Sequence, residues 1–548
     1  NGDLEIITAH SGGHVSVYDH NGYFQPGWPQ VPTSRELRGL SLYDLDGDSK
    51  LEIIATGAVY ERTNTWVYSH NGNLLPGWPQ LTNDSGYAYG IFNDNAAVGD
   101  LDEDGFGEIV VPSDVHYVCA YERDGGQIPA HPMYGDKGWG KVGVWESLEI
   151  ELRGWGTCTN GDERKERYRP NFAHGASLIA DVNADGVREV IVVGNVYDCI
   201  PGYPSQYNGI YIFNTDRSRF NDDGFDWNTP PVDSGAPLSQ DYGVIENNQP
   251  NPVAADLDGN GNLEIIYSSY DGRVHAYWLD KTEHGSWPYS VYNPTEGFYR
   301  FASEPVVADL DDDGYAEVLF VSWPQKGTYQ TGKLHILDSL GNPLHEVVLP
   351  PAYGSPDWNG ALAAPTLADI DSDPDLEVVL TTSHSGFVAY DLPGSDNARV
   401  IWGTGRGNYL RNGSYNPGSL RSSSMTVNHG VASPGERLEY AILLKNPGDI
   451  LPSVTMTNTL PTDITYAGDL LASSGLYTEN DNTITWYGAV SASQPVTITY
   501  SVTVSELIDP SAIIVNSVEL NDGQGRVSQL HATTYINGSA IDLPIISK

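Results

Sequence analysis

The stretch Asp309-Leu-Asp-Asp-Asp-Gly-Tyr-Ala-Glu317 decides the fold. Acidic residues stand at the alternate positions 1, 3 and 5 and at position 9, with a further one, Asp312, at position 4, and Gly314 stands at position 6. Carboxylates this close together repel one another unless a cation neutralises them, and oxygen ligands at alternate positions suit Ca²⁺. Glycine permits a sharp bend because it adopts a positive φ at little cost. Apolar runs at 305–308 and 318–321 have strand character, so the stretch predicts a calcium-binding loop inside a β-hairpin.

The acidic pattern recurs along most of the chain. The chain opens on Asn-Gly-Asp-Leu-Glu-Ile, which matches the second half of a complete copy, so a truncated unit is expected at residue 1, inside a longer natural polypeptide. Each copy is followed by a second alternating strand and a turn, and Pro-Gly-Trp-Pro-Gln follows at 26–30 and 76–80. Four short strands in a unit of roughly 40–60 residues are typical of a β-propeller blade. The complete copies begin at Asp44, Asp100, Asp181, Asp256, Asp309 and Asp369.

These units resemble the FG-GAP or VCBS repeats of integrin-α-like propellers. The resemblance implies an all-β, seven-bladed calcium-binding propeller over residues 1–419, in which each acidic loop joins the first two strands of a blade. It also implies about five to seven Ca²⁺ ions, bound by side chains at positions 1, 3, 5 and 9 and by the carbonyl of position 7. Ser49 and Pro374 replace the glycine in the first and last complete loops, and the site at Asn1, Asp3 and Glu5 is truncated, so weaker binding is expected at Pro374 and at the truncated site. The implied ligands are Asp44, Asp46, Asp48, Lys50 and Glu52; Asp100, Asp102, Asp104, Phe106 and Glu108; Asp181, Asn183, Asp185, Val187 and Glu189; Asp256, Asp258, Asn260, Asn262 and Glu264; Asp309, Asp311, Asp313, Tyr315 and Glu317; and Asp369, Asp371, Asp373, Asp375 and Glu377.

Residues 420–535 have a different composition, rich in Ser, Thr and Val, and alternate between apolar and polar side chains. This pattern predicts an antiparallel β-sandwich, with strands near 425–427, 437–444, 454–457, 483–486, 496–504 and 513–518. The motifs Ser433-Pro-Gly-Glu-Arg-Leu-Glu-Tyr and Lys445-Asn-Pro-Gly resemble the immunoglobulin-like domains of unknown function in bacterial surface and secreted proteins. That resemblance implies spacer, anchoring or assembly roles. Residues 536–548 are expected to form a tail.

Two insertions interrupt the repeats, at 135–173 and near 195–208, and a polar stretch at 217–249 is also expected to be loop. The first carries Trp139, Trp145 and Trp155 outside any repeat, so ligand binding on the face opposite the calcium loops is one interpretation and a local lid is the other. Trp28 and Trp78 occupy one register, which favours packing between blades over stacking on a carbohydrate.

The three cysteines predict one disulfide at most. Cys158 and Cys199 fall in the two insertions, so a bridge between them is expected. Cys119 lies in an alternating strand and is expected to remain a thiol.

The composition excludes several classes of function. The formal net charge of −44 is the opposite of the basic footprint that nucleic-acid binding requires. No stretch approaches the roughly 20 apolar residues of a membrane span. The sequence contains no nucleophile elbow, HExxH helix or phosphate loop, so no enzymatic activity is expected.

The sequence therefore predicts a secreted or cell-surface bacterial protein that binds or adheres to a protein or glycan through the long-loop face of a calcium-stabilised propeller. One alternative is a structural subunit of a surface layer or fibre that contacts copies of itself. Another is the accessory C-terminal region of a larger secreted hydrolase, such as a subtilisin-like peptidase.

Overall fold

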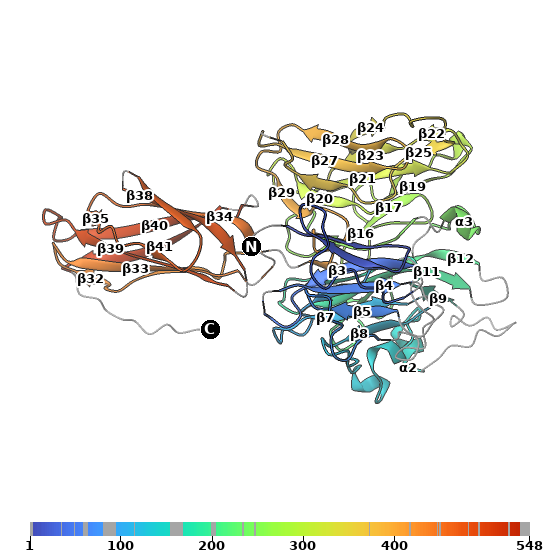
Figure 1. The fold of residues 1–548 in the computed structure, drawn as a ribbon, viewed down its shortest axis with the longest axis horizontal. Coiled ribbons are helices and arrows are strands. Elements are labelled where there is room, and N and C mark those ends of the chain that lie inside the picture. The colour runs from blue at the N-terminus through green and yellow to red at the C-terminus, as the bar shows by residue number, and fades with distance from the viewer. Residues whose placement is uncertain are drawn as a thin grey trace. The chain divides into compact units, whose positions relative to one another are not determined.

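The chain divides into two compact units, Asn1–Tyr415 and Asn416–Lys548, and strands dominate both of them (Figure 1). No helix in the described ranges is long and apolar enough to cross a membrane. A computed structural model describes residues 4–33, 36–48, 50–57, 64–80, 95–113, 115–153, 168–198, 204–232, 235–245, 248–371, 373–415, 418–446, 448, 451–480, 482–491, 494–523 and 527–537.

The first unit is a series of small, mainly antiparallel sheets whose strands largely follow one another in the sequence. Short helices lie between some of them: α2 (Leu148–Leu152), α3 (Tyr242–Ile245) and 3-10 turns at Pro132–Tyr134, Trp139–Lys141 and Pro294–Glu296. The sheets are β1 (Ile6–Ala9) with β2 (Val15–Tyr18); β3 (Leu37–Tyr43), β4 (Glu52–Gly57) and β5 (Thr65–Tyr68); β6 (Ala97–Gly99), β7 (Glu108–Pro112) and β8 (Val118–Tyr121); β12 (Ser205–Phe213), β11 (Glu189–Asp198), β10 (Ser177–Ala180) and β30 (Ser414–Tyr415), with β9 (Tyr168–Asn171) on β11; β13 (Asn221–Asp222) with β14 (Phe225–Asp226); β15 (Val253–Ala255), β16 (Glu264–Ser268), β17 (Arg273–Tyr277) and β18 (Tyr289–Ser290); β24 (Pro343–Val348), β23 (Lys333–Leu337), β21 (Glu317–Pro324), β20 (Val306–Asp309) and β29 (Arg399–Trp402), with β19 (Arg300–Ala302) on β21; β22 (Gln330–Thr331) with β25 (Trp358–Asn359); and β26 (Thr366–Ala368), β27 (Leu376–Thr382) and β28 (Gly386–Leu392).

Every complete acidic segment connects two adjacent antiparallel strands, as the sequence predicts. In each one, the glutamate at position 9 pairs with the residue just before position 1. The pairs are Tyr43 with Glu52, Gly99 with Glu108, Ala180 with Glu189, Ala255 with Glu264, Ala308 with Glu317 and Ala368 with Glu377. The acidic loops therefore share one hairpin geometry.

Consecutive sheets share apolar cores, because their central strands bury side chains from both faces. β11 shows this most clearly, since all ten of its residues are buried. Shared clusters join Val15 to Ile53, Ile54 to Ile109, Val110 to Val190, Ile265 to Val318, and Leu319 to Val378. The sheets therefore stack in chain order, whereas the closed seven-bladed ring stays a prediction.

Residues 399–415 make a connection that the sequence does not predict. β29 pairs with β20, and the segment then runs past the first strands of earlier sheets. The backbone N–H groups of Leu42, Val98 and Ile179 donate to its carbonyl groups at 2.7–2.9 Å, and β30 pairs in parallel with β10. One segment thus ties β3, β6, β10 and β20 together.

The second unit is a two-sheet β-sandwich, as predicted. In β40 (Ile513–Asn521), exposed and buried side chains alternate along the whole strand, so one face meets solvent and the other meets a core around Trp486. All six predicted strands are present, and five further strands, including the long β41, were not predicted. One sheet contains β31 (Ser424–Val427), β33 (Arg437–Leu444), β39 (Val496–Val504), β35 (Ile464–Tyr466) and β36 (Leu471–Ala472), and the other contains β32 (Val431–Ala432), β41 (Val527–Ile536), β40, β34 (Leu451–Thr459), β38 (Thr483–Val490) and β37 (Leu476–Asn480).

Candidate metal centres

The glutamate at position 9 closes every complete acidic loop. Its Oε2 atom accepts a hydrogen bond from the backbone N–H of position 2, at 2.6–3.0 Å. The donor residues are Leu45, Leu101, Val182, Leu257, Leu310 and Ile370. This bond fixes the carboxylate at the base of the loop, and in four loops one glutamate oxygen lies within 4.8 Å of aspartate oxygens.

The loop bends around the carboxylate at position 1. In loop 309–317, the N–H groups of Asp313 and Gly314 both donate to Asp309 at 3.1 Å. Gly314 has a φ of 90°, which confirms the predicted role of the glycine. The residue at position 4 also has a positive φ, which the sequence did not predict, and it is a non-glycine residue in three loops: Glu103, Ala184 and Asp312.

The carboxylates converge in space. In five loops, three carboxylates place one oxygen each within 4.8 Å of the others. Position 5 accepts the N–H of position 7, and it belongs to the converging set only in loops 44–52 and 369–377. Asp369 is not part of the set in its loop. The sets are Asp44, Asp46 and Asp48; Asp100, Asp102 and Glu108; Asp256, Asp258 and Glu264; Asp309, Asp311 and Glu317; and Asp371, Asp373 and Glu377.

Burial disfavours the ionised form of these glutamates and so raises their pKa values. It raises the pKa of Glu52 and Glu317 to about 7, of Glu108 and Glu189 to about 8, and of Glu264 to about 9. Neighbouring aspartates raise these values further, whereas the hydrogen bond from position 2 opposes the rise. A cation bound among these carboxylates would favour the ionised form of the glutamates.

Three of the glutamates carry a buried oxygen with no hydrogen-bond partner among the described residues. Glu108, Glu264 and Glu377 are 1%, 0% and 4% exposed, and in each the Oε1 atom lacks a donor. Leaving such an atom unpaired costs about 1–3 kcal/mol, and more for a charged group. A hard divalent cation among the carboxylates would satisfy these oxygens, so the residues present fit such an ion.

The first and last complete loops depart from this pattern. In loop 44–52, the Lys50 ammonium lies 2.9 Å from Asp48 Oδ2 and so competes with any cation there. In loop 369–377, Pro374 has no N–H to donate to position 1. Ser49 and Ser372 lie outside the described residues.

Tryptophan side chains join one repeat to the next. Trp28 and Trp78 are buried, and their indole N–H groups donate to carbonyl groups in the next repeat, which confirms their predicted packing role. Trp139, Trp227 and Trp287 make the same contact. The five bonds run from Trp28 to His70, Trp78 to Arg123, Trp139 to Thr215, Trp227 to Leu279 and Trp287 to Ser339, at 2.9–3.1 Å.

This contact corrects the ligand-binding interpretation of the insertion. Trp139 is fully buried and Trp145 almost so, because the first packs between repeats and the second lies beside the buried ion pair of Glu151 and Arg219. Neither ring is accessible for stacking on a ligand at the surface. Trp155 lies outside the described residues.

Only one of the three cysteines lies among the described residues. Cys158 and Cys199 lie outside the described residues, so their disulfide stays a prediction. Cys119 is a buried thiol in β8, where burial raises its pKa to about 12.

Three exposed tyrosines lie on connections at the strand ends away from the acidic loops. Tyr329 lies between β21 and β23, and Tyr353 donates its N–H to His384 in the β27–β28 connection. Tyr242 lies in α3, which leads toward β15. Their exposed fractions are 45% for Tyr242, 77% for Tyr329 and 92% for Tyr353. These tyrosines were not predicted from the sequence, although 34 tyrosines are a visible signal.

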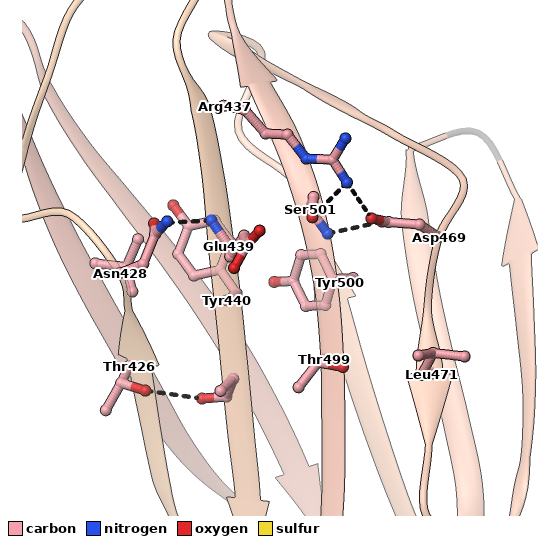
Figure 2. A pocket seen from close by; sticks show the side chains of 12 residues that line it. Thr426, Asn428, Arg437, Glu439, Tyr440, Asp469, Leu471, Thr499, Tyr500 and Ser501 are labelled. Carbon is pink, nitrogen blue, oxygen red and sulfur yellow. Dashed lines mark hydrogen bonds and ion pairs between the residues drawn. The ribbon is translucent and has the colours of Figure 1, made fainter.

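The sandwich carries a groove of about 430 Å³ on the sheet that contains β31, β33 and β39. Figure 2 shows Arg437 directed toward Asp469 and Ser501, with Asn428 beside Glu439. Asp469 also accepts the N–H of Ser501 at 2.8 Å. The charged groups of Arg437 and Asp469 therefore already pair with each other.

Residues 256–320 match the family model of an FG-GAP-like repeat. This segment includes the acidic loops 256–264 and 309–317. No curated protein is matched by the chain.

Several solved structures share remote similarity with parts of the chain. A non-cellulosomal cohesin from the hyperthermophilic archaeon Archaeoglobus fulgidus has 14% identity and a TM-score of 0.16, over 21% of this chain and 91% of that chain. The collagen-binding subdomain of the Enterococcus faecalis surface protein ACE has 9% identity and a TM-score of 0.18, over 21% and 98%. The pilus backbone RrgB of Streptococcus pneumoniae has 13% identity and a TM-score of 0.15, over 18% of this chain and 30% of that chain. Similarity this remote assigns neither a family nor a partner.

Proposed function

We propose that residues 1–415 form a propeller-type repeat scaffold stabilised by Ca²⁺, within an extracellular or cell-surface protein that binds a protein or glycan. One observation carries the proposal: Glu108, Glu264 and Glu377, which belong to the acidic clusters, each keep a buried oxygen without a donor among the described residues. A bound Ca²⁺ ion would give these oxygens the positively charged partner that they lack among the described residues. Oxygen-rich loops of this kind suit millimolar extracellular calcium.

The residues that would hold the ions are those of the five clusters together with loop 181–189. In that loop, Glu189 closes on Val182 as elsewhere, and the buried Oδ1 of Asn183 has no partner among the described residues. Three features support a propeller of seven blades: a shared hairpin geometry, shared cores between consecutive sheets, and repeated tryptophan contacts.

The end away from the acidic loops is the proposed binding surface. Tyr242, Tyr329 and Tyr353 give it exposed aromatic rings that each carry a hydroxyl, a combination enriched at protein interfaces. The acidic loops would then serve the scaffold, because their carboxylates face one another.

A glycan array and a panel of immobilised extracellular proteins test this proposal. The labelled chain should bind in calcium and lose binding in the double variant Tyr329→Ala and Tyr353→Ala, with an unchanged melting temperature. Tyr487→Ala is the control, because Tyr487 is an exposed tyrosine on the sandwich. Equal binding by the double variant would contradict the assignment of this surface.

A structural subunit of a surface layer or fibre is a second candidate. β28 pairs with β27 alone among the described residues, and its Phe387 ring is exposed. An open strand edge with an apolar side chain is suited to pairing with another chain. Light scattering at high protein concentration should then show large assemblies that Val388→Pro removes, and a strict monomer would exclude this candidate.

A further inference from the structure

Hydrogen bonds link the acidic loops to one another in chain order. The backbone N–H of position 8 in one loop donates to the carbonyl of position 2 in the preceding loop. These bonds run from Gly107 to Leu45 at 3.2 Å, from Leu263 to Val182 at 2.9 Å and from Ala316 to Leu257 at 3.0 Å. Loops at adjacent hairpins are therefore in direct contact.

A side chain makes the remaining step of the series. Between loops 100–108 and 181–189, the guanidinium of Arg188 donates to the carbonyl of Asp100. The Thr215 hydroxyl lies close to the same two loops, 3.5 Å from the Leu101 carbonyl and 3.3 Å from that of Arg188. Five consecutive loops, from 44–52 to 309–317, thus form one connected series.

Both backbone polar groups of the residue at position 2, the N–H and the carbonyl, form hydrogen bonds. The N–H of Leu257 donates to Glu264 at 2.7 Å, and its carbonyl accepts the N–H of Ala316 at 3.0 Å. Ala316 directly precedes Glu317, which closes the next loop on Leu310 at 2.8 Å. A short path of bonds therefore connects one glutamate with the next.

The last loop lies outside this series. The N–H of its position 8, Leu376, donates to the Ser395 hydroxyl at 2.7 Å and so is not directed at loop 309–317. Loop 369–377 therefore has the acidic cluster without the hydrogen bond to its predecessor.

We propose that the five connected loops bind cations cooperatively and that loop 369–377 binds independently of them. This inference rests on the proposed function, since it concerns the same calcium loops. An ion that fixes the glutamate at position 9 also fixes the residue at position 2. That residue then holds the neighbouring loop in the conformation that binds the next ion, which is positive coupling.

Trp278 provides a reporter for a single loop. Its indole N–H donates to Asp258 Oδ2 at 3.0 Å, so a Tb³⁺ ion in loop 256–264 lies near an excitable tryptophan. Tb³⁺ binds the oxygen ligands that Ca²⁺ binds. The emission that Trp278→Phe removes defines the signal of this loop.

Two matched variants test the coupling. Asp311→Asn weakens the connected neighbour, and Asp371→Asn makes the same change in the unconnected loop. The hydrogen bond from Ala316 to Leu257 contributes about 1 kcal/mol, which corresponds to about a fivefold change in affinity. If loop 309–317 is no longer held by an ion, loop 256–264 loses this support. Asp311→Asn should therefore move the Trp278-dependent midpoint about fivefold to higher Tb³⁺. Asp371→Asn should leave the midpoint unchanged. Titration at about 0.15 M salt screens exposed charges more than about 8 Å apart.

A third variant separates the hydrogen bond from charge. Ala316→Pro keeps every carboxylate and removes the N–H that reaches Leu257, so it should also move the midpoint about fivefold. Equal midpoints in the native chain, Asp311→Asn and Ala316→Pro would overturn the coupling while leaving cation binding intact. The absence of any Trp278-dependent emission in the native chain would instead contradict the proposed calcium function.

Discussion

The two units bury polar groups in different ways. In the repeat unit, Glu108, Glu264 and Glu377 are buried carboxylates, and one oxygen of each has no hydrogen-bond partner among the described residues. In the sandwich, the central polar group is neutral: the side-chain amides of Asn458 and Asn516 both donate to the Tyr500 hydroxyl at 2.8 Å. Unpaired buried oxygens also occur in the sandwich, on Asn458 and Asn516, but they are neutral amide oxygens rather than carboxylate oxygens. We therefore expect an added cation to stabilise the repeat unit and to leave the sandwich unchanged.

Chelation should show this difference most strongly. An ion present at a hundredfold excess over its Kd contributes about 2.7 kcal/mol, and several ions act on one unit. The melting temperature of residues 1–415 should therefore fall by about 10 °C or more in excess EDTA. Differential scanning calorimetry measures both transitions in one sample, so the sandwich is the internal control. Equal shifts of the two transitions, or none, would contradict the comparison.

Features that depend on residues close together in the chain could be predicted from the sequence, whereas features that depend on distant residues could not. The acidic loops were predictable because their acidic side chains lie within nine residues, and alternation alone predicted six strands of the sandwich. Trp139 was misassigned because its partner Thr215 lies 76 residues away and no Pro-Gly-Trp-Pro motif marks it. Residues 399–415 bond to strands such as β3 and β6 that are hundreds of residues earlier, so no local pattern could indicate their place.

Glu264→Gln tests the buried oxygen directly. In calcium, the amide cannot replace the carboxylate as a charged ligand, so the free energy of unfolding of the repeat unit should fall by about 2–3 kcal/mol. In EDTA, burial and the neighbouring aspartates already disfavour the ionised form of Glu264, so replacing it by a neutral amide should leave the free energy of unfolding no lower than that of the native chain. Chemical denaturation in both buffers measures the difference. Glu519→Gln, at an exposed position on β40, is the matched control; an equal loss for Glu264→Gln in both buffers would exclude a ligand role.

A smaller effect is expected from removing one tryptophan hydrogen bond in each unit. Trp78 donates to the Arg123 carbonyl at 2.9 Å in the repeat unit, and Trp486 donates to the Ser474 carbonyl at 2.7 Å in the sandwich. Replacing either by Phe removes one hydrogen bond and should cost about 1–2 kcal/mol. Each variant should lower only the transition of its own unit in calorimetry. A loss in the sandwich transition from Trp78→Phe would show that the two units unfold together.

The smallest effect is expected at the last loop. Pro374→Gly restores an N–H at the position where Gly314 donates to Asp309 at 3.1 Å, and it permits the positive φ that this position adopts elsewhere. Because one hydrogen bond contributes about 1 kcal/mol, calcium affinity of this loop should rise about fivefold by calorimetric titration. Glycine also loosens the unfolded chain, so in EDTA the variant should be less stable by about 0.4–1 kcal/mol. The opposite signs in the two buffers separate ion binding from chain entropy, and an unchanged affinity would show that Pro374 is not what distinguishes this loop.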